Sequence, residues 1–203
     1  MAQGDLETAW RMMKDKKFPP MSRGFGAYLN MLVYQRRYDD AFTLVSSVLE
    51  KEKNLPPLFI AVSHLSFGNY FRIKGNEAKA RSYFVEAKKE LEQIRAAGDS
   101  GLFAAGALLQ TEARLGHRDA VEQLAAEKLK VVQNDKWQYP REEEEIAHGY
   151  TILGDFERAL PLLQHALATT CVESLTPAYL RLDPEWDPVR NDPRFQKLAN
   201  GKP

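Results

Sequence analysis

The stretch "GDFERALPLLQHA", from Gly154 to Ala166, decides the fold. In it a glycine-aspartate pair is followed by Ala159, Leu163 and Ala166, which share one face of a helix because they stand at i, i+4 and i+7. A helix that only covers a surface has no need of alanine at a fixed position. We therefore infer that a second helix approaches this face too closely to leave room for a larger side chain.

The same pattern occurs four times, and its anchor alanines lie 39, 40 and 39 residues apart. Small or apolar residues recur twelve and nine positions before each anchor, which indicates another helix upstream of it. Glycine stands between the two helices at Gly75, Gly116 and Gly154, where it supplies the left-handed backbone that ends a helix. Each unit is therefore predicted to be helix, tight turn, helix. The anchors are Ala41, Ala80, Ala120 and Ala159.

This pattern resembles the tetratricopeptide repeat, whose signature combines a small residue, a Tyr, a turn like Gly-Asp-Tyr, an Ala and a Phe. The family period is about 34 residues, so the longer spacing here predicts helices more than a turn longer. "AKARSYFVEAKKELEQIRAAG", ending at Gly98, is expected to form one such long second helix. The resemblance implies an all-α fold, an α-solenoid of antiparallel helix hairpins with short C-terminal capping helices. An unrelated bundle of helical hairpins is the alternative.

We expect residues 1–203 to form a single solenoid domain with repeats at 22–54, 61–97, 101–132 and 140–170. Residues 1–20 match the second half of a repeat, with a turn at Gly4, so they are a partial repeat or an N-terminal cap. The apolar side chains of Leu6, Trp10 and Met13 would then be exposed to solvent, which favours a homodimer through the N-terminal end. The alternative is an independent helix that folds back on the first full repeat.

Residues 174–203 are expected to cap the other end. Four Thr-Pro or Asp-Pro pairs there are typical helix starts, and they predict short helices at 177–182, 188–191 and 193–199, ending at Gly201. This tail resembles the ending of helical-repeat regions in large bacterial signalling proteins, which carry a kinase or a winged-helix DNA-binding domain upstream. The residues expected to cover the last repeat are Leu180, Leu182, Trp186, Phe195 and Leu198.

The composition argues against binding to nucleic acid or membrane. Basic and acidic residues number 28 each, so the chain lacks the excess of cations that phosphate neutralisation needs. No apolar run approaches the roughly 20 residues of a membrane span, and no signal peptide is evident. Cys171 is the only cysteine, which excludes an intrachain disulfide and favours a reducing compartment. We therefore expect a cytoplasmic protein.

No motif of catalysis or cofactor binding is complete. "HRD" at 117–119 matches the kinase catalytic triplet, but the Asn that should follow the Asp by five residues is Leu124, and a Gly-rich loop is missing. The four histidines form no i, i+4 ligand pair for zinc. "PREEEE", from Pro140 to Glu145, suits the dipole of a first helical turn better than it suits an acidic ligand cluster. We expect neither an enzyme nor a cofactor.

Ligand contacts in the resembled family come mostly from the concave face, which the first helices line. An Asn carboxamide there can donate to and accept from the backbone of an extended peptide, and an Arg can hold a carboxylate. The expected function is therefore non-catalytic binding of a protein or extended peptide. The alternatives are a regulatory or sensor segment of a larger bacterial signalling protein, an RNA-binding helical repeat, and a scaffold that uses another surface. The candidate site residues are Arg23, Asn30, Tyr34, Asn69, Arg72, Arg141 and His148.

Overall fold

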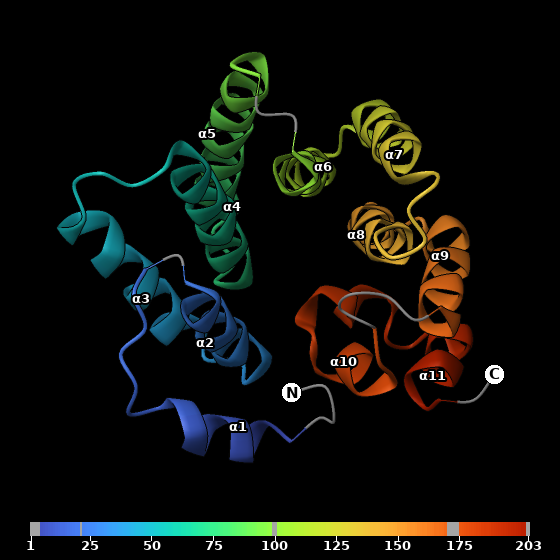
Figure 1. Cartoon of the computed structure of the whole chain (residues 1–203), viewed down its shortest axis with the longest axis horizontal. Coiled ribbons are helices and arrows are strands. Elements are labelled where there is room, and N and C mark those ends of the chain that lie inside the picture. The colour runs from blue at the N-terminus through green and yellow to red at the C-terminus, as the bar shows by residue number, and fades with distance from the viewer. Residues whose placement is uncertain (1–4, 21, 99–100, 170–174, 202–203) are drawn as a thin grey trace.

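The computed structural model describes residues 5–20, 22–98, 101–169 and 175–201, and within them every regular element is a helix (Figure 1). The all-helical prediction is confirmed. Gly4 and Cys171 lie outside the described residues. The elements are α1 (Leu6–Met13), α2 (Arg23–Tyr34), α3 (Tyr38–Lys51), α4 (Pro57–Ile73), α5 (Glu77–Ala96), α6 (Leu102–Leu115), α7 (Arg118–Val132), α8 (Tyr139–Ile152), α9 (Phe156–Ala168), α10 (Pro177–Leu182), the 3-10 helix η1 (Pro184–Val189) and α11 (Pro193–Ala199).

The helices begin and end where the local sequence requires. Asn76 and Asp155 are the N-caps of α5 and α9, and their side chains accept hydrogen bonds from backbone N–H groups in the first turn. Gly75, Gly116 and Gly154 have φ values of 74°, 82° and 74°, so each provides the left-handed conformation at its turn. The long helix expected to end at Gly98 is α5, which spans 20 residues.

Close approach between helices is visible at the anchor positions. Ala80 and Ala159 are 0% exposed. Across from the face of Ala80, Gly68 leaves room for the ring of Phe84, because a Cβ at Gly68 would lie 2.3 Å from Phe84 Cε1. Larger side chains at these positions would therefore force the helices apart.

The predicted anchor is wrong by one residue in α7. Ala120 is partly exposed, whereas Val121 is 0% exposed. Val121 N–H donates to the carbonyl of the N-cap His117, just as the anchor Ala159 donates to Asp155. The cause is the position of Gly116, which starts this turn one residue later than the spacing from Ala80 suggests.

From α1 to α9, helices that follow one another in the chain pack against each other, and together they form a curve (Figure 1). In this view α2, α6 and α8 lie nearer the centre of the curve than α3, α7 and α9. The curve brings residues 175–201, here called the C-terminal segment, opposite α1 and α2. This arrangement positions the site described below.

The C-terminal segment packs on α8 and α9. Leu180, Trp186 and Phe195 are buried in one cluster with Ala159 and Leu163. Helices α10 and α11 cover the expected ranges 177–182 and 193–199. The helix expected at 188–191 is instead η1, which starts at Pro184 because Asp183 is its N-cap.

Helix α1 folds back on α2 rather than standing alone. The rings of Trp10 and Tyr28 stack with centroids 6.0 Å apart, and the guanidinium of Arg37 lies 4.3 Å above Trp10. None of the helix residues is fully buried, and Met12 is 63% exposed. These contacts agree with the alternative in which an N-terminal helix folds back on the first helix pair. The homodimer through the N-terminal end stays a prediction.

In the part of the chain that the structure describes, a helix with the length and apolar character needed to cross a membrane is absent.

Candidate functional site

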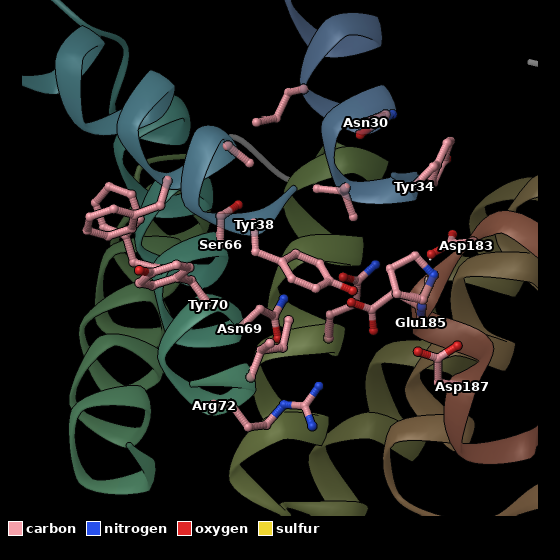
Figure 2. Close-up of a pocket in the computed structure, with 18 of the residues that line it drawn as sticks. Asn30, Tyr34, Tyr38, Ser66, Asn69, Tyr70, Arg72, Asp183, Glu185 and Asp187 are labelled. Atoms are coloured by element: carbon pink, nitrogen blue, oxygen red, sulfur yellow. Dashed lines mark hydrogen bonds between the residues drawn. The ribbon is translucent and has the colours of Figure 1, made fainter. Parts of the chain in front are cut away.

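A cavity of about 530 Å³ lies in the centre of the molecule. Its walls come from α2, α3 and α4 on one side and from α10 and η1 on the other, with Gln110 of α6 and His148 of α8 between them. Figure 2 shows side chains from these separate elements pointing toward one another. A concave site of this volume is in the range that binds a small molecule or a few residues of a peptide.

Most of the predicted site residues meet at this cavity, although they come from three helices. Arg23 does not: it is the exposed first residue of α2 and is not part of the lining. Arg141 does not either: it lies in the first turn of α8, 3.6 Å from the Glu145 carboxylate. The predicted residues that line the cavity are Asn30, Tyr34, Asn69, Arg72 and His148.

One wall is aromatic. The ring of Phe42 lies 4.3 Å from that of Tyr70, nearly parallel to it, and 4.8 Å from that of Phe67. Leu29, Val33 and Val45 extend the apolar surface, so this side of the cavity suits an apolar or aromatic group.

The opposite wall carries three carboxylates of the C-terminal segment, Asp183, Glu185 and Asp187. Glu185 and Asp187 each face an arginine from another part of the chain. Arg114 of α6 donates to Glu185, and Arg36 donates both of its terminal nitrogens to Asp187 at 2.6 and 2.9 Å. The sequence pattern gives no sign of this wall, because it predicts for the C-terminal segment only a capping role over the last repeat.

The environment shifts the pKa values of these groups in both directions. Burial raises the pKa of Asp183 above its usual range. Burial is the largest influence on Glu185 and acts to raise its pKa, but the nearby charges, that of Arg114 first among them, and the hydrogen bond from Arg114 together leave that pKa below the usual range. Burial raises the pKa of the hydroxyl groups of Tyr34 and Tyr179, whose rings meet edge to face. At neutral pH the cavity therefore holds the neutral phenols of Tyr34 and Tyr179 beside the carboxylates of Glu185 and Asp187.

Three polar groups of the cavity have capacity left for a ligand. Asn69 Oδ1 is buried without a hydrogen-bond partner among the described residues. His148 Nε2 is buried without a hydrogen-bond partner in the described part of the chain, because the nearby Asp183 Oδ2 is 3.8 Å away and too distant for a hydrogen bond. Arg72 lines the cavity, is exposed, and forms no ion pair with a described residue. Buried polar atoms normally have partners, so Asn69 Oδ1 and His148 Nε2 mark where a ligand would bind, and Arg72 adds a positive charge beside them.

The acidic run at 142–145 does not line the cavity. Glu142 contacts the buried ammonium of Lys128 at 2.5 Å, and Glu143 contacts His165 Nδ1 at 2.5 Å. The interpretation through the helix dipole alone is therefore incomplete, because these carboxylates also join α8 to α7 and α9. In the parts of the chain with a described structure, no group of three or more His, Cys, Asp or Glu side chains is arranged to hold a metal ion.

Comparison with known proteins gives no relative: no family model, no curated protein and no solved structure matches the chain.

Proposed function

We propose that the chain is a non-catalytic binding module, a tetratricopeptide-like α-solenoid of antiparallel helix hairpins that binds a protein or peptide in its central cavity. The observation that carries the proposal is the meeting of Asn30, Tyr34, Asn69, Arg72 and His148 around one cavity. The repeat pattern predicts that these residues share a concave face. They lie on three separate helices, α2, α4 and α8.

The chemistry of the lining supports a ligand that is partly apolar and partly polar. The aromatic wall would take an apolar side chain, while Asn69 Oδ1 would accept a hydrogen bond from a backbone N–H. Arg72 would pair with a carboxylate or a carbonyl oxygen of the ligand. Because the cavity holds only a few residues, we propose that a short segment of the partner enters it.

Affinity capture from a lysate tests the proposal, with the wild-type chain and the double variant Asn69→Ala/Arg72→Ala as baits. We expect the amount of partner captured by the double variant to be lower than that captured by the wild type by a factor of about ten or more, because one hydrogen bond and one charged contact are lost. Its unfolding free energy should change by less than about 1 kcal/mol, since Arg72 is exposed and Asn69 Oδ1 has no partner to lose. The matched control is Arg81→Ala, an exposed arginine of α5 outside the cavity.

Equal capture by the double variant and the wild type would refute the cavity as the binding site. Failure of the double variant to fold would show that Asn69 and Arg72 belong to the core and that the groove is elsewhere.

The volume of the cavity favours a second candidate, a sensor segment of a larger bacterial signalling protein. About 530 Å³ fits a small organic molecule as well as a peptide segment. A thermal-shift screen with small metabolites separates the two. A sensor would gain several degrees in melting temperature with one compound class, and a peptide-binding module would gain nothing from any of them.

A further inference from the structure

Two side-chain contacts join the first helix pair, α2 and α3, to the C-terminal segment. The guanidinium of Arg36, in the turn between α2 and α3, donates to Asp187 Oδ2 at 2.6 Å and to Oδ1 at 2.9 Å. Next to this ion pair, the rings of Tyr34 and Tyr179 meet edge to face with centroids 5.6 Å apart. The contacts link residues about 150 positions apart and close the curve of helices seen in Figure 1.

The backbone conformation of Arg36 favours glycine at this position, so the arginine side chain must provide something that glycine cannot. Its φ is 60°, and it is the only residue other than glycine with a positive φ in the described ranges. The corresponding turns between α4 and α5, α6 and α7, and α8 and α9 use Gly75, Gly116 and Gly154. A left-handed arginine costs roughly 1 kcal/mol that a glycine would not. The contact with Asp187 is what a glycine at this turn could not provide.

The contact is also weak enough to open. The side chains of Arg36 and Asp187 are 40% and 47% exposed, so their ion pair contributes about 1 kcal/mol or less and is screened by salt. Asp187 stays positioned without Arg36, because Arg190 Nε donates to the same carboxylate at 2.9 Å. Opening the contact therefore leaves the C-terminal segment itself intact.

The contact involves residues of the cavity lining: Asp187 is one of them, and Arg36 also donates to the hydroxyl of Tyr38, another lining residue, at 3.0 Å. Both tyrosines also line the cavity, Tyr34 from α2 and Tyr179 from α10. We propose that the Arg36–Asp187 ion pair is a salt-sensitive latch that closes the central cavity by holding the first helix pair against the C-terminal segment. Its role in regulating ligand access rests on the proposed function, but the latch itself does not.

The test measures the distance between two spin labels, one on each side of the latch, without any ligand. Labels are attached through Glu50→Cys on α3 and Lys197→Cys on α11, both exposed, in a Cys171→Ser background. The wild-type latch should give a narrow distance distribution at about 0.05 M salt and an added population at longer distance at about 1 M, where screening is strong. Asp187→Asn should show that longer population already at low salt.

Arg36→Gly is the second variant, because it relaxes the left-handed backbone and removes the latch from the other side. It should open the molecule as Asp187→Asn does, with no loss of helix content. The matched control is Asp192→Asn, which neutralises a partly buried aspartate that pairs with Arg194 inside the C-terminal segment and keeps a side chain able to cap α11. It should leave the distances unchanged.

The latch is refuted if both variants keep the wild-type distribution at low salt, or if Asp192→Asn opens the molecule equally. Because no ligand takes part, this result is independent of the capture experiment, and either proposal can fail without the other.

Discussion

The helix pairs α8–α9 and α6–α7 fill equivalent positions with different chemistry. In α9 the inward face carries Ala159, Leu163 and Ala166, all of them buried. The corresponding positions of α7 are Val121, Ala125 and Lys128, so a lysine stands where α9 has its second alanine. The same helix position is therefore buried in both pairs. A small apolar residue fills it in α9, and a charged residue fills it in α7.

The second way is a buried charge with partners on both sides. Lys128 is 1% exposed, and its ammonium contacts Glu142 at 2.5 Å, Glu145 at 2.9 Å and the Leu102 carbonyl at 2.9 Å. Gly106 makes room for this cluster, since a Cβ there would lie 2.1 Å from Glu145 Oε2. The cluster joins α6, α7 and α8 where α8–α9 uses apolar contact.

The largest expected effect on stability distinguishes the buried anchor Ala159 from Ala120, the position that the sequence spacing wrongly predicts as an anchor. Ala159→Arg places a long charged side chain where the exposure is 0%, so it should reduce the unfolding free energy by at least about 3 kcal/mol. Ala120→Arg, the same change at the position that only the sequence spacing favours, should cost less than about 1 kcal/mol because Ala120 is partly exposed. Denaturant unfolding measures both, and equal costs would show that the helix contacts are misplaced.

Removing the buried charge of Lys128 in α7 should have the next largest effect on the unfolding free energy. Lys128→Met removes the buried cation from Glu142 and leaves Glu145 only the more distant Arg141, so it should cost about 3–5 kcal/mol. Lys130→Met, two residues further along the same helix, is exposed and should change the stability by less than about 0.5 kcal/mol. If Lys128→Met proves as stable as the wild type, the cluster has no stabilising role.

The pH dependence of Lys128→Met sharpens the same point. Burial raises the pKa of Glu142 above the ordinary 4.5, and the hydrogen bond from Lys128 opposes this rise. Without Lys128 the folded-state pKa rises further, so the folded chain must keep a proton that the unfolded chain releases. The deficit of the variant should therefore be smallest below about pH 4.5 and grow as the pH rises above it. A deficit independent of pH between 4 and 8 would contradict this cause.

Two glycines test close approach at a smaller scale. Gly68→Ala would put a Cβ 2.3 Å from the ring of Phe84 and should cost about 1–3 kcal/mol. Gly26→Ala meets nothing within 4 Å inside α2 and should gain up to about 1 kcal/mol from helix propensity. Thermal unfolding compares them, and a stabilising Gly68→Ala would be incompatible with the contact described.

Much of the helical pattern could be predicted from local features, because glycine turns, N-caps and Asp-Pro pairs act within a few residues. The anchor error at Ala120 was avoidable in principle: Gly75 and Gly154 stand five residues before their anchors, and the same count from Gly116 reaches Val121. The Lys128 cluster gave no such signal, since a lysine in a helix is usually exposed.

The site was only half predictable for a different reason. Asn30, Asn69 and His148 follow from repeat positions, because positions on one face of successive helices line one wall. The opposite wall depends on how far the helices curve before residues 175–201 meet α2, and small rotations between successive helices add up over the whole chain. Nothing local in Arg36 or Asp187 indicates that they meet.

The central claim is that the two ends of this curve touch and enclose the cavity, and a crosslink tests it most directly. Tyr34→Cys and Tyr179→Cys, combined with Cys171→Ser, place two thiols where the rings now meet. A short bis-maleimide should join them within one chain, with a gain in mass of one linker and faster migration in a denaturing gel. Pairing Tyr34→Cys with a cysteine at the exposed Trp137, which is not part of the cavity lining, should give no such product. Absence of the intramolecular product for 34 and 179, with both thiols reactive, would contradict the enclosed cavity.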